Sequence, residues 1–118
     1  MEIDGFLWTY DLFSAEEIAL SADALSEVCD VRGKAPNDRF VLHYTVTGTG
    51  VLRIIYLTAY HYGGTYVTPS AALEVGSGIL VGSDFIEFSP ILAPFIKFQA
   101  LETGGAAAAT ITAHLLTK

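Results

Sequence analysis

Apolar and polar residues alternate along most of this chain, which is the pattern of half-buried β-strands. Residues 39–47 form one such run, with apolar side chains on one face at Phe40, Leu42, Tyr44 and Val46. Residues 51–60 also alternate, but both faces of this run are largely apolar, so we expect a central strand covered on both sides. Similar runs predict further strands at residues 74–81, 84–89, 95–101 and 107–116.

Glycine-rich turns separate these runs. Thr47-Gly48-Thr49-Gly50 and Glu102-Thr103-Gly104-Gly105 are expected to close hairpins. Tyr62-Gly63-Gly64-Thr65 predicts a tight turn, since adjacent glycines accept the positive φ of a two-residue hairpin loop. Pro69 would end the short run that follows, because proline cannot donate to a sheet.

The first 38 residues are open to two interpretations. Residues 6–13 could form a strand or an extended aromatic arm. Ser14-Ala15-Glu16-Glu17 has the composition of a helix start, so a helix over 15–27 is one interpretation. A strand at 17–22 is the other, and we favour it because β-strands dominate the rest of the chain. Residues 32–38 are predicted to be a loop.

Seven or eight short strands, with turns about every ten residues, predict an all-β fold. We expect an antiparallel β-sandwich that is jelly-roll-like, and a closed barrel is the alternative. The 118 residues suit a single domain, in which residues 1–14 could be an N-terminal arm.

Composition adds two expectations. The hydrophobic fraction of 52% is high for so short a chain, so either the core is unusually apolar or a partner covers part of the surface. The chain has no apolar run of membrane-spanning length, no basic signal-peptide start and one cysteine, so we expect no membrane contact and synthesis in a reducing cytoplasm. Cys29 is interpreted as a small buried hydrophobe.

The negative charge is concentrated at one end of the chain. Residues 1–31 hold eight carboxylates and no Lys or Arg, whereas residues 32–118 have a net charge of +1. A net charge of −7 disfavours nucleic-acid binding. The acidic end is either a solvated face or a surface that meets a basic patch on a neighbouring subunit.

Candidate catalytic chemistry is sparse. His43, His61 and His114 each stand alone, without the spacing of a metal site, and neither an EF-hand loop nor a G-x-S-x-G motif is present. We therefore predict no catalytic residue, no cofactor and no metal, and a protein that is not an enzyme.

Aromatic residues give better leads, although ordinary core packing would also account for them. Phe6, Trp8, Tyr10 and Phe13 form a candidate subunit interface near the N-terminus. Tyr60, Tyr62 and Tyr66 form a candidate platform for stacking a sugar.

Three segments together resemble a family of small structural proteins of bacteriophages and prophages: Tyr44-Thr45-Val46-Thr47-Gly48-Thr49-Gly50-Val51, then Gly63-Gly64-Thr65-Tyr66-Val67-Thr68-Pro69, then residues 88–118 from Phe88-Ser89-Pro90 to the closing Ala-Thr-Ile-Thr-Ala-His-Leu. The resemblance covers residues 39–118. It implies a virion component without enzyme activity or cofactor, either a head decoration (cement) subunit or a part of the tail or fibre. We therefore expect the protein to be located in the virion and made in the host cytoplasm.

Three functional hypotheses follow. The leading one is a decoration subunit whose partners are itself, as a homo-oligomer such as a trimer, and the major capsid protein. The second is a tail or fibre module that binds carbohydrate or a receptor. The third is a small hydrolase or isomerase on a barrel, which requires a pocket with convergent ionisable groups.

Overall fold

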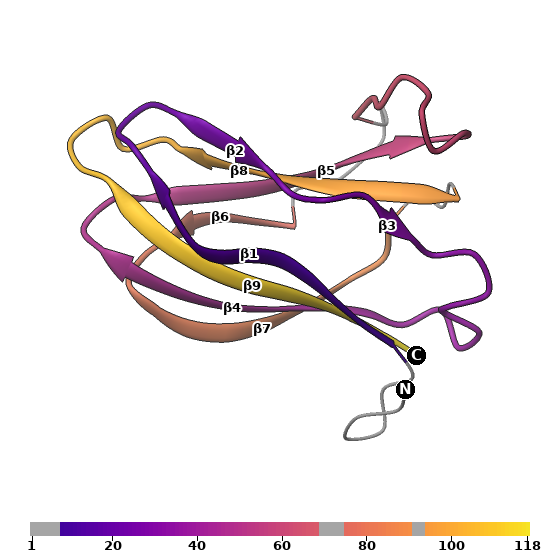
Figure 1. Ribbon diagram of the computed structural model, residues 1–118. Coiled ribbons are helices and arrows are strands. Elements are labelled where there is room, and N and C mark those ends of the chain that lie inside the picture. Colours follow the sequence, from indigo (N-terminus) through magenta and orange to yellow (C-terminus); the bar gives the residue numbers. More distant parts are fainter. Residues whose placement is uncertain (1–7, 69–74, 91–93) are drawn as a thin grey trace.

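The computed structural model describes residues 8–68, 75–90 and 94–118 and confirms the all-β prediction: two antiparallel sheets form a sandwich (Figure 1). Sheet 1 has the strand order β1-β9-β4-β7, and sheet 2 has the order β2-β8-β5-β6, with β3 also paired to β8. The strand bounds are β1 Trp8–Ile18, β2 Asp23–Leu25, β3 Cys29–Asp30, β4 Phe40–Gly48, β5 Leu52–Ala59, β6 Gly76–Ile79, β7 Gly82–Phe88, β8 Phe95–Glu102 and β9 Ala109–Thr117.

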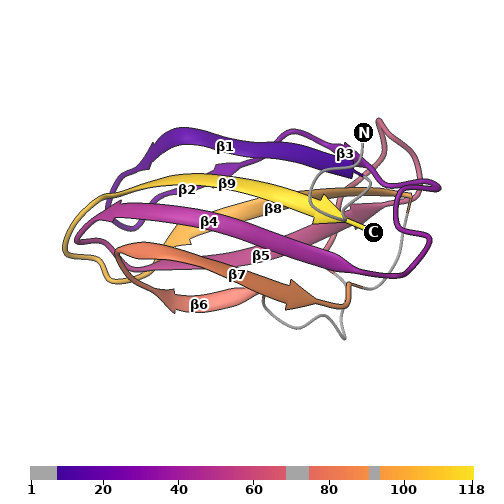
Figure 2. The ribbon, with the colours of Figure 1, turned by 90° about the horizontal axis from the view of Figure 1, so that it is seen from below.

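The strand pairs are nested along the chain. β1 pairs with β9, β2 and β3 pair with β8, β4 pairs with β7, and β5 pairs with β6. Strands paired in this nested order form one long hairpin, with β5 and β6 at its tip. When the hairpin folds over on itself, β9 also pairs with β4 and β8 also pairs with β5. The result is the two-layer jelly roll, seen from the side of sheet 1 in Figure 2, and it excludes the closed barrel.

Two turns that were expected to close hairpins instead join the two sheets. The turn at 48–51 leads from β4 in sheet 1 to β5 in sheet 2, and the turn at 103–108 leads from β8 back to β9. A tight turn does occur near Gly63-Gly64, closed by the Gly64 N–H on the His61 carbonyl at 3.0 Å, but it is not the two-residue hairpin loop that was predicted. Neither glycine has a positive φ, and the chain pairs again only where Thr58 meets Val67.

The N-terminal segment is a strand rather than a helix. No helix occurs in the described part of the chain, so the helix considered for 15–27 is wrong. Of the strand favoured at 17–22, only Glu17 and Ile18 lie in a strand, at the end of β1. Residues 8–14, proposed as part of an arm, pair with β9. Two register shifts interrupt this pairing, and Ala15, which lies within the second of them, has a φ of 49°.

The core lies between the sheets, on the alternating faces that the pattern predicted. The inward side chains of β4, β5, β8 and β9 are almost fully buried, among them Phe40, Leu42, Leu52, Ile54, Ile96, Phe98, Ile111 and Leu115. The expectation that β5 is covered on both sides is not met by the described residues. The outward side chains of Arg53, Ile55 and Leu57 are partly exposed.

One carboxylate joins three connections at an end of the sandwich. Glu102 is 4% exposed and accepts hydrogen bonds of 2.8–3.0 Å from the backbone N–H groups of Ser21, Val51, Gly104 and Gly105. These donors belong to the β1–β2, β4–β5 and β8–β9 connections. The bonds favour the charged form and lower the pKa of Glu102 to about 2. Glu102 therefore fixes how the chain crosses between the sheets.

Gly50 is expected to resist substitution because of the β8–β9 connection beside it. A Cβ at Gly50 would lie 2.7 Å from the carbonyl oxygen of Ala107, so Gly50→Ala should destabilise the fold by about 1–3 kcal/mol. Gly63→Ala is the matched control, since a Cβ there meets nothing within 4 Å. Urea unfolding of both variants checks this, and equal midpoints would contradict it.

Candidate functional site

The N-terminal aromatic residues that were candidates for an interface lie mostly against the sandwich. Phe13 is 3% exposed and belongs to the core. Tyr10 packs against the core and donates its hydroxyl to the backbone oxygen of Asp30 at 2.8 Å. The ring of Trp8 is partly exposed and lies 3.6 Å from the ammonium of Lys34. Phe6 lies outside the described residues.

The tyrosines proposed for ligand stacking lie after β5, at the tip of the long hairpin. Tyr60 and Tyr62 are 73% and 65% exposed. Tyr66 is partly buried, donates its hydroxyl to the backbone oxygen of Tyr62 and packs under the ammonium of Lys97. Two large aromatic faces are therefore open to solvent, and the third tyrosine holds their loop in place.

A shallow cleft of about 340 Å³ lies beside these tyrosines. Its lining comes from three separate segments, namely Arg32, then Tyr60, His61 and Tyr62, and then Pro94 and Phe95. The rings of Tyr62 and Phe95 meet edge to face at 5.8 Å, and those of Tyr60 and His61 at 4.8 Å. The jelly roll creates this site, because β8 brings Phe95 to the end of β5.

Arg32 is held in a fixed position at the edge of this cleft. Its guanidinium donates to both oxygens of Asp30, at 2.9 and 2.7 Å, and lies 4.9 Å from the centre of the Phe95 ring. The side-chain hydrogen bonds from Arg32 lower the pKa of Asp30 to about 2, so the pair stays charged at neutral pH. Asp30 neutralises Arg32, so the cleft offers an ion pair beside aromatic rings, which suits a hydroxyl-rich ligand.

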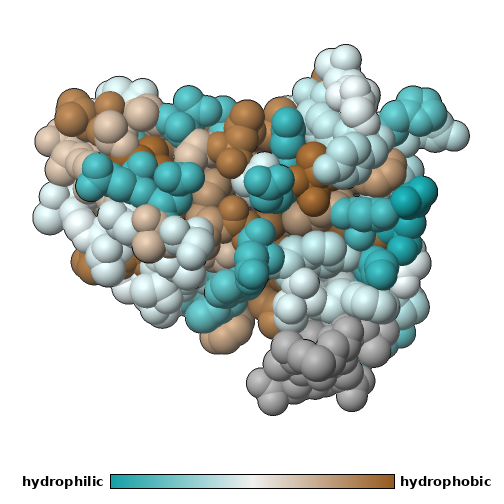
Figure 3. All heavy atoms as spheres, viewed as in Figure 1, coloured by the Kyte–Doolittle hydropathy of each residue, from teal (hydrophilic) through white to brown (hydrophobic). Residues whose placement is uncertain are grey.

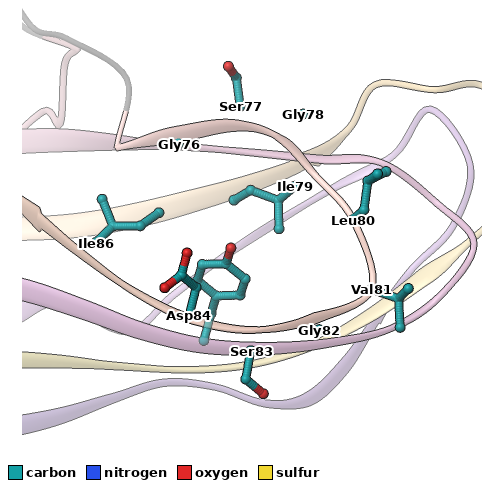
Figure 4. A pocket seen from close by; sticks show the side chains of 11 residues that line it. Gly76, Ser77, Gly78, Ile79, Leu80, Val81, Gly82, Ser83, Asp84 and Ile86 are labelled. Atoms are coloured by element: carbon teal, nitrogen blue, oxygen red, sulfur yellow. The ribbon is translucent and has the colours of Figure 1, made fainter.

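A second cleft of about 340 Å³ lies between β6 and β7, at a lateral edge of the sandwich. Figure 4 shows Ile79, Ile86 and Asp84 facing this space, whereas Ser77 and Ser83 point away from it. Asp84 is the register partner of Tyr44. Burial, and secondarily the charge of Asp84, raise the pKa of the Tyr44 hydroxyl, so it stays protonated at neutral pH. The cleft has apolar and polar lining in similar measure, with one carboxylate.

A row of side chains crosses the outer face of sheet 1. The Phe85 ring stacks on His43 at 4.3 Å, His43 lies parallel to His114 at 6.4 Å, and His114 Nδ1 is 2.9 Å from the Asp11 carboxylate. These four residues come from β7, β4, β9 and β1 in turn. The sequence places each histidine on an outward face, but only the strand order brings the two rings together.

The described residues give little support for a metal site or for a reactive cysteine. Within residues 8–68, 75–90 and 94–118, no three His, Cys, Asp or Glu side chains group closely enough to hold a metal ion. Cys29 is buried, as predicted, and burial raises its pKa to about 12, so the thiolate that would act as a nucleophile is scarce. The described residues also contain no helix able to cross a membrane.

No protein-family model and no curated protein matches this chain.

Proposed function

We propose that this protein is a non-enzymatic structural subunit of a phage virion, specifically a decoration subunit that binds the outside of a capsid. The observation that carries the proposal is the contrast between the two lateral edges of the jelly roll. One edge carries five exposed carboxylates, with the exposed side chains of Leu20 and Leu25 among them. The other edge, called the apolar edge, exposes three large apolar side chains beside Asp84 and Glu87, and this contrast suits a subunit with a different neighbour on each side. The jelly roll agrees with this role only by analogy, because capsid proteins share the fold with lectins and enzymes.

The acidic edge is formed by β1, β2 and the residues that follow them. Asp11, Glu16 and Glu17 are exposed on β1, and Asp23 and Glu27 are exposed beyond it. Figure 3 views this edge and shows hydrophilic side chains in separate groups with apolar atoms between them. Such a surface would attract a basic capsid surface and orient the subunit.

The apolar edge lies on the opposite side, where β6 and β7 end the two sheets (Figure 2). Leu80, Val81 and Phe85 are each more than half exposed there. Large contiguous apolar patches mark contact surfaces, and these three side chains are the ones that would form such a patch at this edge. Homo-oligomer formation through this edge would account for part of the high hydrophobic fraction.

Binding of the purified protein to phage capsids that lack it tests the proposal. We expect cosedimentation with the capsids and a rise in the temperature at which they disassemble. A protein that stays monomeric and leaves the capsids bare would overturn the proposal.

The acidic edge makes a sharper prediction about salt. Binding should weaken at least about tenfold between 50 and 500 mM salt, because salt screens exposed charges. The double variant Glu16→Gln/Glu17→Gln should bind more weakly than Thr47→Lys/Thr49→Lys, although both change the net charge from −7 to −5. Equal losses in the two variants would mean that total charge, rather than the acidic edge, controls binding.

The exposed Tyr60 and Tyr62 beside the fixed Arg32 favour a second candidate function, a tail or fibre module that binds carbohydrate. An array of bacterial surface glycans tests it. Reproducible binding that Tyr62→Ala abolishes and Leu25→Ala leaves intact would support this function. An array without such a hit would count against it.

A further inference from the structure

Strand β7 has a free edge, along which its outward backbone groups have no partner strand among the described residues. It pairs with β4 in unbroken register from Gly82 to Phe88, and no other described strand pairs with it. The N–H of Phe85 bonds to the carboxylate of Asp84 rather than to β4. Because backbone groups point alternately to the two sides of a strand, Ser83, Phe85 and Glu87 direct their N–H and C=O groups toward the free edge.

The other outer strands carry features that oppose pairing with a further strand. β1 is interrupted by two register shifts and carries Glu16 and Glu17. β2 has three residues, and β6 has four, including Gly78 at a φ of 62°. On β7, the inward-facing carboxylate of Asp84, in the cleft between the sheets, also opposes pairing with a further strand, but less strongly than these features. β7 is therefore the long, regular edge of the sandwich.

The row of rings on sheet 1 ends at this edge. Phe85 stacks on His43 at 4.3 Å, yet its side chain remains 63% exposed. One side of the ring thus has a partner, and the side toward the free edge is open. A second aromatic ring at the edge would continue the row.

We propose that β7 pairs antiparallel with β7 of a second copy, about a two-fold axis beside Phe85. This register sets Phe85 opposite Phe85 of the partner subunit, Ser83 opposite the partner's Glu87, and Asp84 opposite the partner's Ile86. No like charges face each other, and the aromatic pair is the kind that stabilises neighbouring strands. The Asp84 carboxylate releases the Phe85 N–H, which then donates to the carbonyl of the partner's Phe85.

The strand that pairs with β7 is β7 of a second copy, because this pairing is more favourable than pairing with β1, the strand at the opposite edge of sheet 1. Pairing of β7 with β1 of another copy would bring Asp84 and Glu87 toward the acidic residues of β1 and would meet its two bulges. A two-fold pair closes on itself, so it gives a dimer rather than a fibre. The dimer extends the proposed homo-oligomer but does not depend on capsid binding.

Sedimentation velocity over a range of concentrations tests the dimer in the absence of any capsid. Ser83→Pro removes an N–H that faces the free edge while leaving the pairing with β4 intact. Ser83→Ala is the matched control, since both variants lose the 2.8 Å hydrogen bond to the Thr45 hydroxyl. We expect the native chain and Ser83→Ala to dimerise, and Ser83→Pro to be a folded monomer.

A second variant keeps the test decisive if Ser83→Pro fails to fold. Phe85→Cys places two thiols across the two-fold axis, at the Cα spacing of about 5.5 Å that suits a disulfide. Mild oxidation should cross-link it much faster than the loop variant Thr49→Cys, and the buried Cys29 will not compete. A native chain that stays monomeric, a Ser83→Pro protein that still dimerises, or equal cross-linking of the two cysteine variants would each overturn the proposal. Capsid binding is a separate readout, so either proposal can fail without the other.

Discussion

Glu102→Gln is expected to lower the thermal unfolding midpoint by roughly 10 °C, one of the two largest effects of a single substitution that the structure predicts. Each carboxylate oxygen accepts two backbone N–H groups. Glutamine keeps one accepting oxygen and turns an NH₂ group toward the other two donors, which then have no partner. Calorimetry measures the midpoint, and Glu27→Gln, at an exposed carboxylate, is the control. Equal midpoints would show that Glu102 does not hold the three connections together.

The same carboxylate gives a pH dependence of stability. The pKa of Glu102 is lowered from 4.5 to about 2 in the folded chain, so the unfolded chain binds the proton first. Its contribution to stability is complete above pH 4.5 and is lost as the pH falls toward 2. We expect urea midpoints to fall over this window less steeply in Glu102→Gln than in the native chain. Parallel curves would contradict the assignment.

Phe98→Ala is expected to cost about 3–5 kcal/mol, a large share of the 5–15 kcal/mol typical of a domain. Phe98 lies on the inner face of β8 and is fully buried. Its ring meets Phe88 of the opposite sheet edge to face at 5.9 Å, so truncation leaves a cavity between the layers. Urea unfolding measures the loss, and Tyr60→Ala, at an exposed ring, should change stability by less than about 0.5 kcal/mol.

A double-mutant cycle makes this a test of the sandwich itself. Phe88 belongs to sheet 1 and Phe98 to sheet 2, so their coupling requires the two layers to pack face to face. We expect a coupling of about 0.5–1.5 kcal/mol between Phe98→Ala and Phe88→Ala. Strictly additive losses would argue against this layer arrangement.

The strands were predictable from the sequence because burial on one face imposes a period of two. The runs at 39–47 and 51–60 became β4 and β5 with end shifts of one residue. The connections were not predictable, because turn chemistry at Gly48 or Gly104 does not reveal which sheet the next strand joins. The sequence of β1 was ambiguous for a similar reason: Ala15 and Ser21 take positive φ values, which interrupt the alternation near Glu16 and Glu17.

The candidate sites were predictable only in part. The exposure of Tyr60 and Tyr62 agrees with the proposed stacking role, but nothing in the sequence places Arg32 or Phe95 beside them. Glu102 looked like an ordinary turn residue, since its four donors come from segments up to 81 residues away. The pair of His43 and His114 depends equally on long-range register. No short sequence motif marks these sites, because each of them is assembled from segments that are far apart in the chain.

Quantitative mass spectrometry of virions tests the central claim most directly. Virions purified from the organism that encodes this chain would be compared with their major capsid protein, copy for copy. A decoration subunit predicts that the chain is present in numbers comparable to those of the capsid protein. Absence from the particles would contradict a virion role, and a few copies per particle would contradict capsid decoration and favour the tail or fibre module.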